Sequence, residues 1–149
     1  IIPCKPHEII TPVVGRMRPQ FNEKEITLTA DVSDDLPSVR ADADRTAQVL
    51  TNLLGNALQY TAAGGEVRLK VFQEYPHLRF VVTDTGIGIA PHDLDHIFER
   101  FYRVDQARSR NGGGSGLGLA IVQQLCQAQG WRVRIQEGPE GGTDVVVTL

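Results

Sequence analysis

The amino-acid sequence predicts an α/β fold of the α+β two-layer sandwich type, with three main helices on one face of a mixed, mainly antiparallel sheet of about five strands. Three observations support this prediction. The 149 residues suffice for one domain with a real core. Apolar residues recur at helical spacing in some segments and alternate with polar residues in others. Hydrophobic residues make up 41% and charged residues 22%, which excludes a disordered or fibrous chain.

The overall charge argues against broad electrostatic binding to nucleic acid or to an anionic membrane. The chain has 15 basic and 18 acidic residues and a net charge of -3. The basic residues are nevertheless concentrated in one place, because Arg100, Arg103, Arg108 and Arg110 lie in a short stretch whose one acid is Asp105. Any anion-binding site is therefore expected to be local.

The amino-terminal part of the sequence predicts one helix and one strand. Apolar residues recur at helical spacing over residues 10–21, although Pro12 and Pro19 would each cost up to ~3 kcal/mol inside a helix. Residues 26–32 then alternate between apolar and polar side chains, which is typical of a half-buried strand. A short extended piece is expected over residues 38–41.

The next segment predicts a long helix over residues 43–60. Asp42 is a typical N-cap residue, and most apolar residues after it fall on one helical face. Asn52 and Asn56 leave the helix one turn apart on a different face. Because asparagine is a mediocre helix former, the pair indicates either metal or phosphate binding or a solvent-exposed polar stripe. Tyr60 follows one turn later, where its ring could cover a planar base.

The central part of the sequence predicts two strands, over residues 66–74 and 78–83, and then a break. Asp84 follows the second strand and precedes Gly86 and Gly88. A carboxylate at this place can accept a hydrogen bond from an exocyclic amine, and the glycines let the backbone approach a flat ring closely. For this motif alone, an ordinary D-x-G turn is the alternative.

A long, mostly polar connection over residues 91–115 leads to a third helix, expected over residues 116–129. A final antiparallel pair of strands is expected at residues 131–137 and 143–149. The glycine-rich residues 112–119 enter the third helix directly, so that free backbone N–H groups and a helix N-terminus point to one place, as phosphate binding requires. This run matches neither the dinucleotide fingerprint nor a Walker loop. A flexible linker is the alternative, but the apolar helix that follows favours a function.

Five short motifs stand in a fixed order along the sequence. They read LTNLLGNALQYT (residues 50–61), DTGIGI (84–89), IFERFYR (97–103), GSGLGLAIV (114–122) and GGT (141–143). In this order they resemble the N box, first glycine box, F box, second glycine box and closing G-x-T turn of sensor histidine kinases. Because the motifs extend from about residue 42 to the end of the chain, chance is not a plausible explanation of the match.

This resemblance implies that residues 1–149 form the catalytic ATP-binding domain of a histidine kinase. The superfamily also contains gyrase, the heat-shock ATPase chaperones and the mismatch-repair ATPases. By analogy Asn56 would coordinate Mg²⁺ on the phosphates, with Asn52 assisting. Asp84 would accept a hydrogen bond from the adenine amino group, and Tyr60 would pack near the base.

The resemblance also implies that residues 91–115 form a long ATP lid that closes around the phosphates. Arg103, and after it Arg108 or Arg110, would neutralise the γ-phosphate, which agrees with the arginine cluster noted above. The other nucleotide-binding positions that the motifs imply are Gly86, Gly88, Gly114, Gly116, Leu117, Gly118 and Thr143.

The implied activity is transfer of the γ-phosphoryl group of Mg-ATP to a histidine on a separate dimerisation domain of the same protein, with a response regulator downstream. Asn52 stands where relatives that hydrolyse ATP place a glutamate, and an amide cannot activate water, so slow hydrolysis is expected. Gln59 and Asp144 depart from the family pattern at a phosphate contact and at the sheet edge. The alternatives are a nucleotide-sensing module without transfer activity and a serine kinase of the anti-sigma type.

A histidine motif near the start of the chain imitates the phosphoacceptor of the family. HEIITP at residues 7–12 matches the pattern H-E-[LI]-x-[TN]-P. In the family that histidine lies on a separate two-helix domain, and the 45 residues from His7 to Asn52 leave no room for a helical hairpin. We therefore interpret the match as a coincidence and expect the phosphoacceptor outside this chain.

Cys4 and Cys126 are far apart in the sequence, and Cys126 falls in an apolar helical pattern, which predicts a buried free thiol in a reducing compartment. No run of about 18 apolar residues is present. Because the sequence begins without Met, we expect a piece of a longer chain. We expect this piece to be cytoplasmic and monomeric, without direct membrane contact, within a protein that is membrane-anchored elsewhere.

Overall fold

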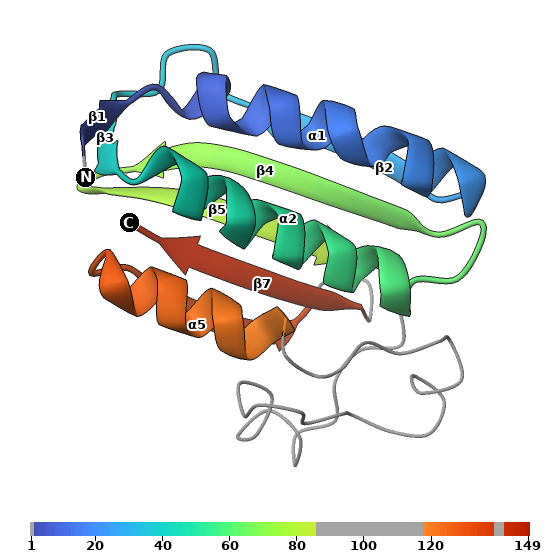
Figure 1. The fold of residues 1–149 in the computed structure, drawn as a ribbon. Helices are drawn as coiled ribbons and strands as arrows, with labels where there is room; N and C mark the ends of the chain where they lie inside the picture. Colours follow the sequence, from blue (N-terminus) through green and yellow to red (C-terminus); the bar gives the residue numbers. More distant parts are fainter. Residues whose placement is uncertain (1, 86–117, 139–141) are drawn as a thin grey trace.

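The computed structural model describes residues 2–85, 118–138 and 142–149. In chain order the elements are β1 (Ile2–Cys4), α1 (Pro6–Glu23), β2 (Thr27–Val32), β3 (Val39–Ala41), α2 (Ala43–Tyr60), β4 (Glu66–Glu74), β5 (His77–Asp84), α5 (Gly118–Ala128), β6 (Arg132–Glu137) and β7 (Thr143–Thr148). The helices α1, α2 and α5 lie in one layer against one face of a five-stranded sheet (Figure 1). The predicted two-layer fold is confirmed.

The sheet has the strand order β2-β4-β5-β7-β6. Strands β2 and β4 are parallel, and the other three pairs are antiparallel, as expected for a mixed, mainly antiparallel sheet. A second sheet of two short strands, β1 and β3, was not predicted. Its β1 spans only three residues, too few for an alternating pattern to be visible in the sequence.

Helix α1 is confirmed; it continues through both of its internal prolines and extends on both sides beyond residues 10–21, over which the apolar spacing indicated a helix. Pro12 and Pro19 are exposed, while the opposite side of the helix is buried in the core. Burial stabilises each large apolar side chain by roughly 1.5–3 kcal/mol, which offsets the hydrogen bonds that the prolines remove. The buried apolar side chains of α1 are Ile9, Ile10, Val13, Val14, Met17 and Phe21.

The core lies between the helices and the inner face of the sheet. Alternate residues of β4, β5 and β7 point toward the helices, and the leucines of α2 meet them there. These buried side chains include Leu50, Leu53, Leu54, Val67, Leu69, Val71, Phe80, Val82, Val145 and Val147. Dense packing here holds the strand ends in fixed positions.

One end of the sheet collects the chain segments that carry the predicted motifs. Strand β5 ends at Asp84 and β7 begins at Thr143, and these two residues are Cα partners. The carboxyl-terminal end of α2 lies near the same end of the sheet (Figure 1). The fold therefore brings parts of three distant motifs to one side of the domain.

Candidate functional site

Asp84 and Thr143 form a buried polar pair at this end of the sheet. They are 7% and 4% exposed, and they lie opposite each other on neighbouring antiparallel strands. The Thr143 hydroxyl is buried and has no hydrogen-bond partner. A buried hydroxyl without a partner costs ~1–3 kcal/mol, and a ligand that supplies the missing hydrogen bond would recover this cost.

The turn before Thr143 approaches Asp84 so closely that only glycine fits. A Cβ atom added to Gly142 would overlap the carbonyl oxygen of Asp84 and lie 3.0 Å from the Cα of Thr85. The G-x-T turn therefore packs its backbone directly against the end of β5. This contact fixes the position of Thr143 relative to the carboxylate of Asp84.

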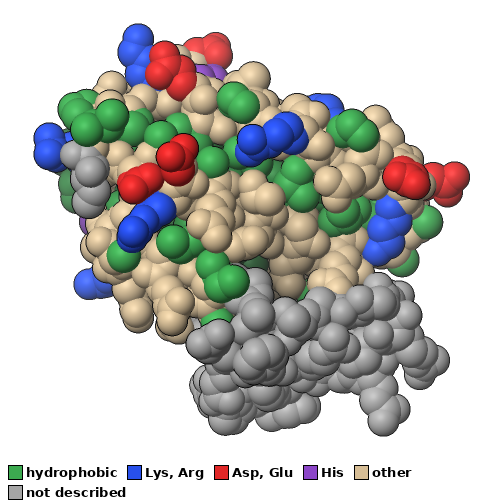
Figure 2. Space-filling model, in the orientation of Figure 1, with side chains coloured by type: hydrophobic (Ala, Val, Ile, Leu, Met, Phe, Trp, Pro, Cys, Tyr) green, Lys and Arg blue, Asp and Glu red, His purple; other side chains and the backbone are tan. Residues whose placement is uncertain are grey.

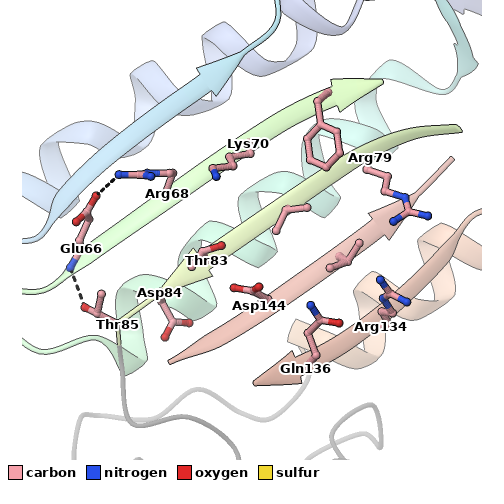
Figure 3. Close-up of a pocket in the computed structure, with 13 residues that line it drawn as sticks. Glu66, Arg68, Lys70, Arg79, Thr83, Asp84, Thr85, Arg134, Gln136 and Asp144 are labelled. Carbon is pink, nitrogen blue, oxygen red and sulfur yellow. Dashed lines mark hydrogen bonds and ion pairs between the residues drawn. The ribbon is translucent and has the colours of Figure 1, made fainter. Parts of the chain in front are cut away.

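A second close contact joins the end of α2 to the end of β5. A Cβ atom added to Gly65 would meet the Cγ2 of Thr61 and lie 3.0 Å from the Thr85 hydroxyl. That hydroxyl accepts a hydrogen bond of 3.0 Å from the backbone N–H of Glu66 (Figure 3). Thr61 itself is 1% exposed, and its hydroxyl has no partner. The sequence alone does not indicate a role for Thr61, although the residue lies within the N box.

Helix α2 presents Asn52 and Asn56 beside its buried leucines. Both asparagines are half-buried. The Asn52 Nδ2 is buried and has no hydrogen-bond partner. With a rise of ~1.5 Å per residue, Asn52, Asn56 and Tyr60 form a row about 12 Å long that leads to the end of the sheet. The solvent-exposed stripe is therefore the weaker interpretation of the two asparagines.

The start of α2 is fixed by hydrogen bonds of its own. The Asp42 carboxylate accepts from the backbone N–H of Arg45 at 3.0 Å, as expected for an N-cap. At the other end, the Lys24 Nζ donates to the carbonyl oxygens of Leu58 and Gln59 at 2.7 and 3.1 Å. Burial lowers the pKa of Lys24. Both helix ends are thus secured without using Asn52 or Asn56.

The residues at this site offer hydrogen-bond acceptors, donors and neutral oxygen ligands. A carboxylate accepts, hydroxyls do both, and the amide of asparagine supplies an oxygen that hard cations such as Mg²⁺ bind. Within the described ranges no group of three or more His, Cys, Asp or Glu could hold a metal ion. The donor set fits a polar planar ligand and, through the amides, a cation that a ligand shares.

Part of the predicted site lies outside the residues that the structure describes. Gly118 is the first residue of α5. The predicted positions Gly86, Gly88, Arg103, Arg108, Arg110, Gly114, Gly116 and Leu117 lie outside the described residues, as does the predicted lid.

His7 lies far from the site along the sheet. It stands in the first turn of α1, where its Nε2 contacts the carbonyl oxygen of Ser33 at 2.9 Å. The backbone N–H of Ser33 donates to the carbonyl oxygen of Val71 on β4. The Cα partner of Val71 on β5 is Phe80, which lies four residues before Asp84. At ~3.4 Å per residue this is about 13 Å along the strand. The position favours the interpretation of the His7 motif as a coincidence.

Cys126 is fully buried and free, as predicted. Desolvation raises the pKa of its thiol to about 11, so the residue is a structural rather than a reactive cysteine. In the part of the chain that the structure describes, no helix is both long and apolar enough to span a membrane.

Comparisons with known proteins agree with this geometry. The family model for "Histidine kinase-, DNA gyrase B-, and HSP90-like ATPase" matches residues 41–149. The signal transduction histidine-protein kinase BaeS of Escherichia coli is 36% identical over 135 residues, which is 91% of this chain and 29% of BaeS. The chain therefore spans less than a third of that relative.

Two solved structures are similar over nearly the whole chain. The mycobacterial sensor histidine kinase MprB has a TM-score of 0.83 and 31% identity, and the match covers 99% of this chain and 95% of the MprB chain. Full-length ShkA, solved in complex with AMPPNP, has a TM-score of 0.83 and 35% identity over 98% of this chain and 30% of ShkA. The resemblance that the motifs indicated is thereby confirmed.

Proposed function

Because the chain belongs to the histidine kinase-, DNA gyrase B- and HSP90-like ATPase family, with sensor histidine kinases among its relatives, we propose that it binds Mg-ATP and phosphorylates a histidine on a separate dimerisation domain. The observation that carries this proposal is the set of buried side-chain atoms without partners along α2 and beside Asp84. These atoms belong to Asn52, Thr61 and Thr143. A bound nucleotide would supply hydrogen-bond partners for such atoms.

The adenine base would bind at the Asp84–Thr143 pair. The carboxylate of Asp84 accepts a hydrogen bond from the exocyclic amine, and the hydroxyl of Thr143 donates to a ring nitrogen. Tyr60, which is 9% exposed, packs its ring near the base. AMPPNP, which accompanies ShkA in its structure, is an ATP analogue and supports this choice of nucleotide.

The phosphates would lie along the row of α2 asparagines. Asn56 would hold Mg²⁺ through its amide oxygen, and the buried Asn52 amide would assist by donating to a phosphate oxygen. The ion, when bound, neutralises charge between the phosphates. One or two protein ligands suffice, because Mg²⁺ takes its other ligands from phosphate and water.

The lid would complete the site. We assign Arg103, followed by Arg108 or Arg110, to the γ-phosphate, and the backbone N–H groups around Gly114, Gly116, Leu117 and Gly118 to the phosphates. Gly86 and Gly88 would let the backbone approach the base. The transferred group would pass to the histidine of the partner domain, and from there to a response regulator in the cytoplasm.

Phosphoryl transfer in trans tests this function. Incubated with γ-labelled ATP, the chain alone should bind the nucleotide and stay unlabelled. When the dimerisation domain of the longer protein that we expect is added, a histidine on that domain should acquire an acid-labile, base-stable label. The Arg103→Ala variant should slow transfer more than it weakens binding, because the arginine acts on developing charge.

Three results would contradict the proposal. Labelling of the isolated chain that His7→Gln abolishes would make His7 the phosphoacceptor. An acid-stable label would indicate a serine kinase. Nucleotide binding without any transfer to the supplied domain would indicate a sensing module.

A further inference from the structure

The face of the sheet opposite the helices carries a second feature, which begins beside Asp84 of the nucleotide site and extends toward Arg79 and Arg134. Within the described residues no helix or strand covers this face. A cavity of about 380 Å³ lies on it, lined by side chains from β4, β5, β6 and β7 (Figure 3). Strand alternation places these side chains, apart from that of Asp84, away from the helix-side core.

The register of the strands arranges this face as a small apolar centre with cations around it. Val81 and Val146 are Cα partners, Lys70 is the partner of Val81, and Arg134 is the partner of Val146. One row across four strands thus reads Lys70, Val81, Val146, Arg134. Arg79 stands on the same face of β5, two residues before Val81. Two valines are therefore flanked by three cationic side chains.

Several of the charged groups on this face lack partners. Lys70 and Arg134 make no ion pair with any described residue. The guanidinium of Arg79 lies 3.5 Å from Glu74, but its Nε is buried without a hydrogen-bond partner. A buried donor that remains unpaired costs free energy, which a ligand with an acceptor would recover.

One acceptor on the same face also lacks a partner. The Oδ1 of Asp144 is buried without a hydrogen bond, between the strands that carry Thr83 and Gln136, its Cα partners. A ligand for this face therefore has to bring negative groups for the cations and at least one N–H for Asp144. Peptides with acidic side chains combine these two properties, since every non-proline residue has a backbone N–H.

We propose that this open face binds an acidic peptide segment of a partner protein. Its carboxylates pair with Lys70, Arg79 and Arg134, an apolar side chain packs on the half-buried Val81, and a backbone N–H donates to Asp144. The proposal goes beyond the nucleotide function and does not depend on it. Lys, Arg, Asp and Glu are interspersed on the helix side (Figure 2). On the open face, Glu66 and Glu74 are already paired with Arg68 and Arg79, which leaves Lys70 and Arg134 available to an acidic ligand.

An anionic membrane is the less suitable ligand for this face. The chain as a whole has a net charge of -3. Glu66 and Glu74 border the cations and Asp144 lies among them, so a flat, uniformly negative surface would meet acidic groups at several points. A peptide can place its own charges between these carboxylates.

Amide chemical shifts with a synthetic peptide test the proposal. The probe is acetyl-Glu-Asp-Leu-Glu-Val-Glu-amide, with acetyl-Lys-Lys-Leu-Lys-Val-Lys-amide as its charge-reversed control. The acidic peptide should shift amides of β4 to β7 around Val81 and Val146, and the basic peptide should not. The double variant Lys70→Glu/Arg134→Glu should bind the acidic peptide at least about 10-fold more weakly.

A matched variant separates the open face from net charge. Arg16→Glu/Arg40→Glu changes two exposed cations on α1 and β3 by the same total charge and should leave peptide binding nearly unchanged. Both double variants should bind ATP like the parent chain. A negative result for peptide binding can therefore be distinguished from a loss of nucleotide binding. Absence of peptide shifts, equal weakening by both variants, or binding to phosphatidylserine vesicles that Lys70→Glu/Arg134→Glu abolishes would overturn the proposal.

Discussion

The buried polar side chains at the two ends of helix α2 differ in whether they form hydrogen bonds within the protein. At the start, the Thr46 hydroxyl is 1% exposed and donates to the Asp42 carbonyl oxygen at 2.8 Å, while the Asp42 carboxylate caps the helix. From the middle of the helix to its other end, Asn52, Thr61 and the neighbouring Thr143 have buried polar atoms without partners. At the first end the side chains of Asp42 and Thr46 are paired, although the Nε2 of Gln129, whose Oε1 accepts from the Asp42 N–H at 2.9 Å, is buried without a partner. At the second end, we propose that the bound nucleotide supplies the missing partners.

The difference separates stabilising polar groups from ligand-binding ones. A hydrogen bond that is already formed adds about 0.5–1.5 kcal/mol to stability, whereas a buried group left unpaired costs about 1–3 kcal/mol. Removing a paired group should therefore lower stability and leave ligand affinity unchanged. Removing an unpaired group at the site should leave stability unchanged and lower ligand affinity.

The largest effect is expected at Gly142, where the ligand-binding end depends on backbone contact. Gly142→Ala would force its Cβ into the carbonyl oxygen of Asp84. We expect a loss of about 3 kcal/mol or more in the free energy of unfolding, because backbone on both sides cannot move aside easily. Urea unfolding followed by circular dichroism measures it.

Gly15→Ala is the control for this substitution. No atom lies within 4 Å of a Cβ added to Gly15, which stands on the exposed side of α1. Alanine should stabilise the helix there by up to about 1 kcal/mol. Equal stability of the Gly142→Ala and Gly15→Ala proteins would mean that the G-x-T turn does not pack against β5 as described.

Asn56→Ala should give the next largest effect, on binding alone. Loss of an amide that orients Mg²⁺ and phosphate should weaken Mg-ATP binding about 10- to 100-fold. The fold should stay intact, because alanine is the better helix former. Titration calorimetry with Mg-ATP, beside thermal unfolding of the same sample, measures both, and unchanged affinity would exclude Asn56 as a ligand.

Asp84 should determine the choice of base. Its carboxylate accepts from the amino group of adenine but would face the carbonyl oxygen of guanine, where two acceptors repel. ATP should therefore bind at least about 10-fold more tightly than GTP, and Asp84→Asn should narrow that ratio. Competition between the two nucleotides measures it. Equal binding of ATP and GTP by the parent chain would refute this role.

The smallest effect is expected at the start of α2, where the Asp42 side chain caps the helix. Asp42→Ala removes the side-chain cap of the helix and should lower the free energy of unfolding by about 1 kcal/mol. ATP affinity should not change, because the cap lies more than two turns before Asn52. A loss of affinity similar to that of Asn56→Ala would show that the two ends are not independent.

Local patterns in the sequence were sufficient to predict most of the fold. Helix α2 begins and ends at the predicted residues because Asp42 marks its start, and β4 matches residues 66–74 because its side chains alternate regularly. The ends of α1 were not predictable, because Pro12 and Pro19 have a local cost that only tertiary burial outweighs. The pairing of β1 with β3 joins segments too short to carry a pattern.

The candidate site was predictable only in part. The motifs identified Asn52, Asn56, Asp84 and Thr143, but not which of their polar atoms lack partners, because that depends on contacts between distant segments. Thr61 stayed unassigned for the same reason. The open face was also invisible, because its cations are dispersed over four strands and gather only through the register.

Two threonine-to-valine substitutions test the central claim most directly. Thr46 and Thr143 are 1% and 4% exposed, and they differ in that the hydroxyl of Thr46 is paired and that of Thr143 is not. Thr46→Val should lower the free energy of unfolding by about 1 kcal/mol and leave ATP affinity unchanged. Thr143→Val should leave stability unchanged or raise it by up to about 1 kcal/mol, while ATP affinity falls roughly 3- to 10-fold. If Thr143→Val instead destabilises the domain and binds ATP like the parent chain, the unpaired hydroxyl is not a ligand-binding group and the proposed nucleotide site is contradicted.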